Sequence, residues 1–422
     1  MQNQRISPIS LISIFTLIAF ALRIFQLATQ SFWYDEAFSV YLARFDLGTI
    51  TARTAADIQP PLYYYFLNVW MLFVGDSEFA VRFLSLVFGV LTIPLMYVTA
   101  RRLFLSPLLS AADALPNSIR VGAQPPSPKI HAKQISPQNF RRGEIAALLG
   151  ALIATFSALY VWYSQEARMY TLITFLGLLS SYALLRATSS QPSPYKGEGA
   201  RWWTIFVIAN IAAVYTHYFA FTLLAFQFVY ALYIILSRRE MRDAIRYLLF
   251  AFIAIFVAFL PWVPFMLNRL GEDASYFRGD LKLDEAIRHI LINFSVGESV
   301  LENTAQYLAV GWLVVLAIAL VAVIVVRRSS FVSNTNSGVV FAILYLVVPL
   351  VLLLFLFSRN PKFNARYLML ASPGLFFLLG AGLASLLSLA QSKNVLMRVA
   401  FAALFLFAFG FLLFTSLSSI SN

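Results

Sequence analysis

The sequence predicts an all-α polytopic membrane protein with about eleven transmembrane helices. Of its 422 residues, 60% are hydrophobic and only 12% are charged. Soluble domains carry about 25% charged residues and about 45–50% apolar ones, so this composition is typical of a chain that faces lipid. Long apolar runs also recur along the chain. The net charge of +12 is explained by basic loops at one membrane face, so we expect no nucleic-acid partner.

Eleven apolar segments are candidates for the spans, and all but the short segment 202–216 are near the length of about 20 residues that crosses a bilayer. The run after Arg5 is expected to stay as the first span, because no cleavage pattern of a signal peptide follows it. The two segments within 202–236 must form a tight hairpin at Thr216–Tyr218. The predicted segments are 7–27, 79–100, 145–163, 169–187, 202–216, 218–236, 247–268, 304–326, 338–358, 367–389 and 395–416.

The segment 60–75 decides the topology. It opens with Pro60–Pro61 and is rich in tyrosine and tryptophan, which favour the membrane–water boundary. We therefore predict an interfacial helix here rather than a span. With this assignment the inner segments hold 19 of the 31 Lys and Arg residues, and the outer segments hold 14 of the 19 acidic residues. Counting 60–75 as a span would turn the basic loops outward, against the positive-inside rule.

We treat residues 1–422 as a single transmembrane domain with four loops of note. The first outer loop, 28–78, is expected to hold the interfacial helices. The inner loops 105–143 and 188–200 lack periodicity and are rich in Pro and Ser, so we expect them to be flexible. The outer loop 269–303 contains a helical pattern and is expected to cap the site or bind an acceptor. The chain has no cysteine, which excludes disulfides and thiolate metal sites.

Four polar clusters interrupt the apolar chain, each at the end of a long apolar run. The threading places all four at the same outer face, where carboxylates, arginines and a histidine would converge on an active site. No nucleotide-binding glycine motif is present in the sequence. The clusters are WYDE at 33–36, SQEARMY at 164–170, THY at 216–218 and NARY at 364–367.

The first cluster supplies the candidate catalytic residues, Asp35 and Glu36. Adjacent residues of a helix point about 100° apart, so the two carboxylates cannot serve one ligand in the same way. One could accept a proton from an acceptor while the other holds a metal or orients a partner. The alternative is a solvated helix N-terminus whose acids complement the helix dipole.

The last cluster supplies cations that suit a phosphate. Arg359, Lys362 and Arg366 flank the start of the tenth span, where positive-inside placement does not explain them. An arginine matches phosphate oxygens with two parallel hydrogen bonds, which would stabilise a departing lipid phosphate. Arg82 follows Glu78 by four residues, and we expect a structural pair there.

At these residues the chain resembles the membrane-embedded GT-C glycosyltransferases. More narrowly, it resembles the superfamily of protein O-mannosyltransferases and aminoarabinose transferases, including its bacterial RgtA/B/C/D-like branch. The resemblance covers residues 7 to about 390. It is carried by the Asp-Glu pair after the first span, PPLYY from Pro60, SEFAVRFLSLVFGVLTIPLMYVTARRLF at 77–104, WYSQEARMYTLI at 162–173, the His-Tyr tip and the late Arg-Tyr. Many relatives have a histidine before the Pro-Pro, where this chain has Gln59.

This resemblance implies a GT-C fold and the transfer of a sugar from a polyprenyl-phosphate carrier to an acceptor, with inversion. It implies a site at the outer face of a bacterial inner membrane, with Asp35 as the catalytic acidic residue. The acceptor is left open between lipid, polysaccharide and protein. A divalent metal is also left open, with Glu36, Glu166 and His217 as candidate ligands. We predict that Arg366, Arg168, Lys362 and Tyr367 bind the donor phosphate, and that Glu166, His217, Tyr218 and Tyr63 line the pocket.

The main alternative is a secondary transporter or lipid flippase. Such proteins place ionisable residues near the bilayer midplane, often on broken helices. In this chain the charges gather at the outer ends of the predicted spans, which favours surface chemistry. A non-catalytic scaffold is the second alternative, and it would need no converging acid and phosphate clamp.

Overall fold

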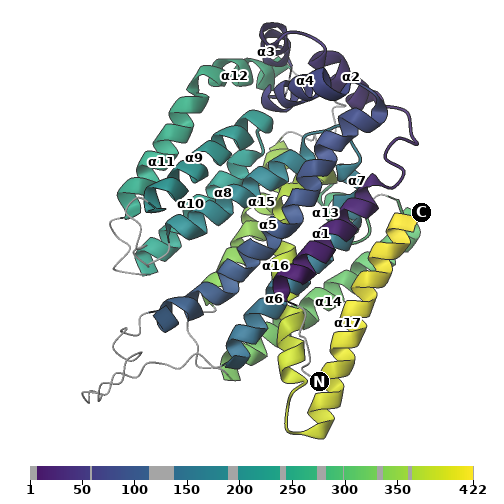
Figure 1. Cartoon of the computed structure of the whole chain (residues 1–422), viewed down its shortest axis with the longest axis vertical. Helices are drawn as coiled ribbons and strands as arrows, with labels where there is room; N and C mark the ends of the chain where they lie inside the picture. Colours follow the sequence, from purple (N-terminus) through teal and green to yellow (C-terminus); the bar gives the residue numbers. More distant parts are fainter. Residues whose placement is uncertain are drawn as a thin grey trace.

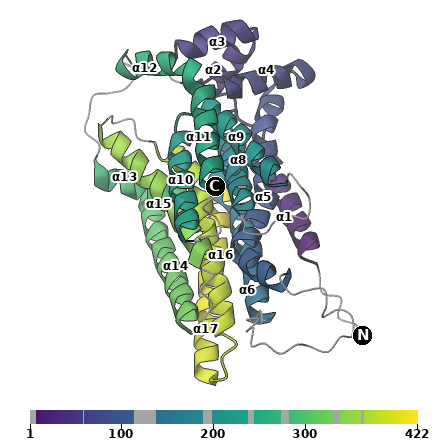
Figure 2. The same ribbon diagram turned by 90° about the vertical axis from the view of Figure 1, so that its left-hand side faces the viewer.

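The structure, a computed structural model, forms helices and no strand over the residues that it describes. Long helices form a bundle, and several short helices gather at one end of it (Figures 1 and 2). The predicted all-α polytopic fold is therefore confirmed. The structure describes residues 7–57, 59–113, 137–188, 198–237, 244–272, 282–297, 299–329, 336–359 and 364–421.

Every predicted span coincides with helical structure. The predicted segments 247–268 and 367–389 each contain a short 3₁₀ helix as well, η3 (Leu260–Trp262) in the first and η5 (Ala365–Ala371) in the second. The long elements are α1 (Pro8–Ile24), α5 (Glu78–Asp113), α6 (Pro137–Phe156), α8 (Tyr170–Ala187), α9 (Glu198–Thr216), α10 (Ala220–Ser237), α11 (Ala244–Phe259), α14 (Glu302–Ser329), α15 (Asn336–Arg359), α16 (Ser372–Leu389) and α17 (Val395–Ser421).

The count of eleven spans is not confirmed. By length and apolar composition, eight helices within the described residues can cross a membrane, or nine if one bent pair counts as a single span. The helix α1 has only 17 residues and falls short of the length of a span. The helix α9 is not among these eight helices either. Its first turns contain Glu198, Arg201 and two tryptophans.

The bent pair corrects the prediction of one continuous span over 145–163. α6 ends at Phe156, and α7 (Ala158–Ser164) continues at an angle of 53°. The buried Arg23 of α1 occupies this break, because its guanidinium donates to the carbonyl oxygens of Thr155 at 3.2 Å and Ala154 at 3.3 Å. A cation at the carbonyl end of a helix satisfies acceptors that the break leaves without partners. The bend therefore redirects the chain into the turn that carries Glu166 and Arg168.

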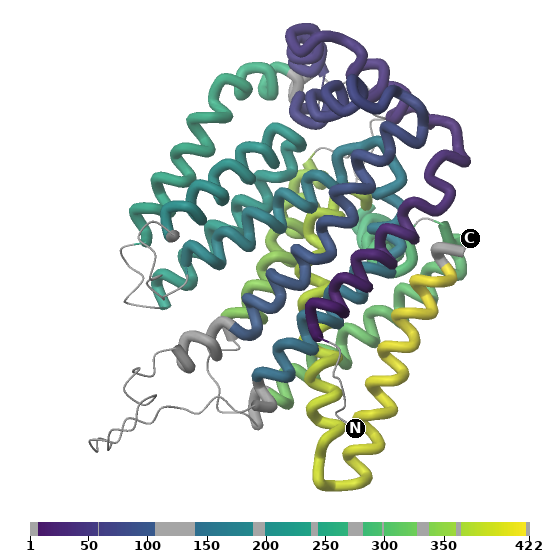
Figure 3. The backbone as a smooth tube through the Cα atoms, viewed as in Figure 1, coloured from purple at the N-terminus to yellow at the C-terminus, as the bar shows by residue number. Residues whose placement is uncertain are grey.

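The first loop forms α2 (Tyr34–Ala43), α3 (Leu47–Ala55) and α4 (Leu62–Val74). The chain runs from the end of α1 into these helices, which lie across the end of the bundle near α12 (Val263–Glu272) (Figures 2 and 3). α4 follows the Pro-Pro pair and ends at Gly75, whose φ of +80° favours glycine. Its last turn exposes Leu72 and Phe73. A short helix with an exposed apolar end suits a membrane surface, and the interfacial placement of this helix stays a prediction.

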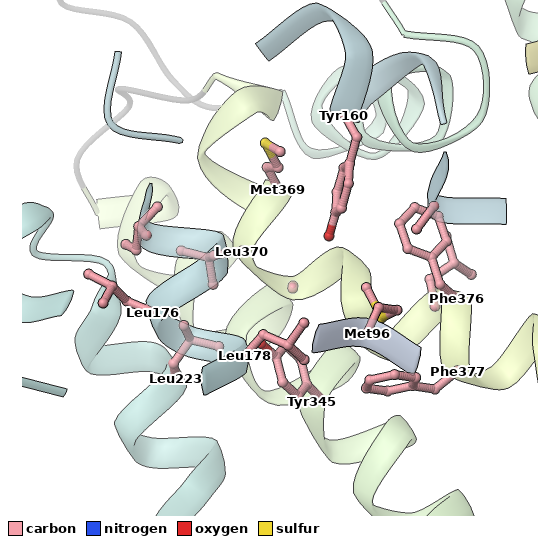
Figure 4. Close-up of a cluster of buried hydrophobic side chains, with 14 of the residues drawn as sticks. Met96, Tyr160, Leu176, Leu178, Leu223, Tyr345, Met369, Leu370, Phe376 and Phe377 are labelled. Carbon is pink, nitrogen blue, oxygen red and sulfur yellow. The ribbon is translucent and has the colours of Figure 1, made fainter. Parts of the chain in front are cut away.

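The core of the bundle centres on α16, whose residues are almost all buried. Small residues let neighbouring backbones approach this helix: a Cβ on Gly380 would lie 2.5 Å from the carbonyl oxygen of Ala146, on α6. Such small-residue contacts are the usual means of close packing between membrane helices. Figure 4 shows aromatic and aliphatic side chains of α5, α7, α8, α10, α15, η5 and α16 meeting in one cluster. The cluster joins η5, which carries Arg366, to the rest of the bundle.

The predicted loops lie partly outside the described residues. Within 105–143, the helices continue to Asp113 and resume at Pro137, and the residues between them are not described. Within 188–200, residues 189–197 are not described. In the outer loop 269–303, the helical pattern corresponds to α13 (Leu283–Ser295), which packs against η5 and α7.

Candidate active site

Asp35 and Glu36 open α2 and face different surroundings. Glu36 is 1% exposed, and its carboxylate receives two hydrogen bonds from Arg82, at 2.8 and 2.7 Å. The backbone N–H of Ala167 donates to the same carboxylate at 2.8 Å. Such a bidentate buried pair leaves this side chain little capacity for a substrate. The partner of Arg82 is therefore Glu36 rather than the predicted Glu78, because folding brings α2 against the start of α5.

Glu36 accordingly connects separate segments of the chain at the candidate site. Its contacts link α2, α5 and the turn after α7, three elements that lie far apart in the sequence. Arg82 also donates to the carbonyl oxygens of Leu27, Gln30 and Ser31, which lie in the segment between α1 and α2. The catalytic or metal-holding part of Glu36 stays a prediction, and the structure shows its carboxylate engaged by Arg82 and by the backbone of Ala167.

The carboxylate of Asp35 is 27% exposed and lies between two arginines. Its Oδ2 atom is 3.4 Å from Nη2 of Arg366 and 3.8 Å from Nη2 of Arg168. These residues come from α2, η5 and the turn before α8, so the structure brings together three of the four polar clusters at this point. A partly exposed carboxylate can still receive a proton from a substrate, which the buried carboxylate beside it cannot.

Arg168 is fixed from both sides. Its Nη1 donates to the carbonyl oxygen of Asp35 and to Oγ of Ser39, both at 3.1 Å. Its own carbonyl oxygen accepts a hydrogen bond from Ser85 at 3.0 Å, and the Tyr63 hydroxyl lies 3.4 Å from the same serine. Tyr63 therefore supports the position of Arg168 through Ser85, and its predicted place in the pocket lining stays a prediction. A buried cation held in this way is preorganised for an anion.

Arg366 lies in an aromatic setting. Its guanidinium carbon is 5.2 Å from the ring centre of Trp33, 5.6 Å from that of Tyr170 and 5.8 Å from that of Tyr367. Asn364 caps this segment, because its side chain accepts the backbone N–H of Arg366 at 3.1 Å. The Nε atom of Arg366 is buried and has no hydrogen-bond partner among the described residues. Stacking restricts the guanidinium, and an unpaired donor remains for a ligand.

His217 lies beside these arginines, in the turn between α9 and α10. Burial, together with the charges of Arg168 and Arg366, lowers the pKa of His217 to about 3, so the imidazole is neutral. Its Nδ1 accepts the backbone N–H of Phe219 at 3.2 Å, which leaves the proton on Nε2. That Nε2 is buried and has no partner among the described residues. Its ring lies 5.7 Å from that of Tyr367.

Two further predicted residues make contacts with tryptophans. Glu166 accepts a hydrogen bond from the indole of Trp162 at 3.0 Å. The hydroxyl of Tyr218 accepts from the indole of Trp262 at 2.9 Å, so this side chain faces η3 and not Asp35, because adjacent residues of the turn point in different directions. Lys362 lies outside the described residues.

The predicted metal candidates do not form a cation site. Within the described ranges, no group of three or more His, Asp or Glu side chains is placed to hold a metal ion. Of the three candidates, Glu36 is occupied by Arg82, and His217 lies beside two arginines that would repel a cation. The donors that surround Asp35 suit an anion instead.

Four residues that shape the site are not among the predicted site residues. Trp33 and Tyr170 provide the ring faces for Arg366, and Ser39 and Ser85 hold Arg168. Trp33 and Tyr170 do stand within the quoted clusters. No sequence pattern identifies the two serines as site residues, because each lies one turn or more inside a helix. They are identified only by the contacts that they make.

A family model matches part of the chain. Residues 58–117 match the model of the dolichyl-phosphate-mannose-protein mannosyltransferase family, a stretch that runs from before α4 through α5. A comparison with curated protein sequences finds no match.

Solved structures with a similar fold are membrane glycosyltransferases. The apo structure of ArnT from Cupriavidus metallidurans superposes with a TM-score of 0.57 at 13% identity, covering 97% of this chain and 76% of that one. The same protein bound to undecaprenyl phosphate gives 0.55 at 14% identity, with the same coverage. The archaeal oligosaccharyltransferase AglB from Archaeoglobus fulgidus, with an inhibitory peptide and a dolichol-phosphate, gives 0.53 at 12% identity, covering 98% of this chain and 56% of that one. The chain therefore has the fold of the GT-C membrane glycosyltransferases.

Proposed function

We propose that this protein transfers a sugar from a polyprenyl-phosphate donor to an acceptor hydroxyl at the extracytoplasmic face of a bacterial inner membrane. The observation that carries the proposal is the set of groups around Asp35. One partly exposed carboxylate lies between two arginines, and the unpaired Nε–H of Arg366 and Nε2–H of His217 lie nearby. Buried donors without acceptors are rare in proteins, and a phosphate would supply the missing acceptors.

In the proposed reaction, Asp35 and the two arginines each have one part. Asp35 accepts the proton of the acceptor hydroxyl while the acceptor oxygen forms a bond to the anomeric carbon. The bond from that carbon to the phosphate oxygen breaks on the opposite face, and its electron pair stays with the phosphate. Attack opposite to the leaving group inverts the anomeric centre. Arg366 and Arg168 stabilise the negative charge that grows on the polyprenyl phosphate.

A neutral His217 suits the binding of the donor better than a protonated histidine would. A third cation beside two arginines would be costly in a buried site, whereas a neutral Nε2–H donates without adding charge. We assign His217 to the donor phosphate or the sugar, and Tyr367 to the wall that joins it to Arg366. The fold relatives support a lipid-phosphate ligand, because ArnT is seen with undecaprenyl phosphate and AglB with a dolichol-phosphate.

A secondary transporter or lipid flippase is the alternative. It would place its ionisable groups in the middle of spanning helices. Asp35, Arg168 and His217 instead lie at the start of α2, before α8 and after α9. These positions favour chemistry at a membrane surface.

The test compares membrane glycolipids and surface glycans by mass spectrometry in cells with and without the gene. We expect one glycan to lose a single sugar in the deletion strain and to regain it with the wild-type gene but not with Asp35→Asn. An unchanged glycan profile together with altered export of an intact lipid would favour the transporter. Restoration of the sugar by Asp35→Asn would contradict the assignment of the base.

A further inference from the structure

The first turn of α4 contains a buried hydroxyl that has no part in the proposed reaction. Tyr64 is 1% exposed, and its hydroxyl oxygen is buried without a hydrogen-bond partner among the described residues. The tyrosines on either side of it are both engaged: the hydroxyl of Tyr63 lies 3.4 Å from Oγ of Ser85, and that of Tyr65 lies 2.5 Å from Oγ1 of Thr51. A buried hydroxyl without a partner is costly, so an unpaired one beside a candidate site indicates a ligand.

Tyr64 lies on the α4 side of the candidate active site. α4 packs against α2, which carries Asp35. The charged groups that act on the Tyr64 hydroxyl are Arg168, Asp57 and Asp35. Arg168 is itself held against α2, because it donates to the carbonyl oxygen of Asp35 at 3.1 Å. The unpaired hydroxyl therefore lies beside the same arginine and carboxylate that form the candidate site.

The Tyr64 hydroxyl is available as a hydrogen-bond donor. Burial raises its pKa to about 12, so the hydroxyl keeps its proton at neutral pH. The guanidinium of Arg168 approaches the hydroxyl, but an arginine has only donors, so this approach leaves the tyrosine proton without an acceptor. The missing partner is therefore an acceptor oxygen.

A phosphate oxygen and a sugar hydroxyl are two sources of such an oxygen. On the η5 side of the site, the unpaired Nε–H of Arg366 and Nε2–H of His217 suit the phosphate. The Tyr64 hydroxyl instead lies among one arginine and two carboxylates, those of Asp35 and Asp57. Their net negative charge disfavours an anion but not a neutral hydroxyl. A neutral sugar is therefore the ligand that fits the α4 side.

We propose that Tyr64 recognises the transferred sugar by donating a hydrogen bond from its hydroxyl to a hydroxyl oxygen of the sugar on the lipid donor. This inference rests on the proposed function, because it requires a sugar-bearing polyprenyl phosphate at the site. No bond forms or breaks at Tyr64, which binds the sugar and takes no proton. A sugar that lacks an oxygen at this position would leave the buried hydroxyl unpaired, so Tyr64 contributes to the choice of sugar.

The experiment measures which lipids the purified full chain retains in detergent from a total lipid extract of the host membrane, by native mass spectrometry. The chain carries Asp35→Asn, which blocks transfer and so leaves the donor intact. We expect it to retain a sugar-bearing polyprenyl phosphate as well as undecaprenyl phosphate. Addition of Tyr64→Phe should lower the ratio of the sugar-bearing lipid to undecaprenyl phosphate about five- to tenfold, the effect of one lost hydrogen bond. Binding of undecaprenyl phosphate itself should not change.

Tyr65→Phe in the same Asp35→Asn chain is the matched control. It removes a hydroxyl from the same helix, but one that pairs with Thr51 of α3. We expect this variant to keep the lipid ratio and to have a lower melting temperature. Tyr64→Phe should keep or raise the melting temperature, because it removes no hydrogen bond within the protein.

The outcomes separate this inference from the proposed function. An unchanged lipid ratio in the Tyr64→Phe chain, or an equal fall in the Tyr65→Phe chain, would overturn the contact with the sugar and leave the proposed function standing. Equally weakened binding of both lipids would assign Tyr64 to the phosphate and would also overturn that contact. Retention of undecaprenyl phosphate without any sugar-bearing lipid by the Asp35→Asn chain would overturn the proposed function, and this inference with it.

Discussion

The two sides of the first turn of α2 differ although their carboxylates are neighbours in the sequence. On one side, Glu36 is 1% exposed and all its strong contacts are made within the protein. On the other side, Asp35 is partly exposed and lies beside two arginines whose Nε atoms have no hydrogen-bond partner among the described residues. A carboxylate therefore connects parts of the protein on one side. On the other side, a carboxylate remains available for a substrate. We refer to these as the structural side and the reactive side.

The difference teaches that charge alone does not identify a catalytic carboxylate. Both carboxylates lie beside arginine, yet the Glu36–Arg82 pair has two short hydrogen bonds and the Asp35–Arg366 pair has one long contact of 3.4 Å. A closed bidentate pair is satisfied, whereas a long contact can be exchanged for a ligand. The following variants test whether the two sides can be separated.

The largest effect is expected for Asp35→Asn, on the reactive side. Loss of a general base typically slows a reaction by about 10²–10⁴-fold, and the amide keeps the shape of the side chain. We expect sugar transfer to fall by that factor while the melting temperature in detergent stays near that of the wild type. Asp76→Asn is the matched control, since that exposed carboxylate pairs with Arg44 at the same end of the molecule. Equal loss in both variants would remove the distinction.

Glu36→Gln tests the structural side. The change leaves Arg82 buried without its countercharge, and breaking such a pair costs about 3–5 kcal/mol. We expect a large drop in the melting temperature and loss of activity only as a result of unfolding. The double variant Glu36→Gln with Arg82→Met should be more stable than Glu36→Gln alone, because no unpaired charge remains. A stable Glu36→Gln protein without activity would instead assign this residue to the chemistry.

The variant Arg366→Lys also tests the reactive side, and we expect a smaller effect from it. Lysine keeps the charge but cannot form two parallel hydrogen bonds or stack in the same way on Trp33 and Tyr170. We expect binding of undecaprenyl phosphate to weaken by about 10–100-fold, measured by native mass spectrometry. Arg44→Lys is the control, since this exposed arginine pairs with Asp76 and was not predicted to bind phosphate. Wild-type affinity in Arg366→Lys would remove this residue from the phosphate clamp.

The smallest effect concerns His217 and pH. Its pKa is about 3 in the folded protein and about 6.5 when unfolded, so the unfolded chain binds the proton first as the pH falls. The stability that this neutral group contributes is present above pH 6.5 and is lost toward pH 3, by about 1.4 kcal/mol per pH unit. We expect His217→Gln to flatten this part of the stability profile, measured by thermal unfolding in detergent from pH 7 to 5. An unchanged profile would mean that His217 titrates normally.

The sequence predicted the membrane fold well because apolar runs of spanning length depend only on local composition. All eleven predicted segments are helical, and α4 was distinguished from a span by its tyrosines and its Pro-Pro start. The break at Ser157 was missed, since no proline or glycine marks it and the stabilising Arg23 comes from another helix. The count of spans depends on helix lengths at the membrane boundary, which composition does not determine.

The sequence indicated which residues belong to the candidate site better than it indicated how they are arranged. Asp35, Arg168, Arg366 and His217 were selected because each polar cluster ends an apolar run. Arg168 and Arg366 meet at the carboxylate of Asp35, and His217 lies beside the two arginines. Which acid faces Arg82 could not be read from the chain, because that choice depends on how α2 rotates against α5. The contacts of Tyr63 and Tyr218 depend in the same way on the packing of distant helices.

The most direct test of the reactive side is a cryo-electron microscopy map of the full chain with undecaprenyl phosphate. We expect the phosphate within hydrogen-bonding distance of Arg366 and of Nε2 of His217, with the carboxylate of Asp35 on the opposite side of the adjoining sugar position. Density for the phosphate far from both residues, with Asp35 still paired to Arg366 as in the unliganded chain, would contradict the account.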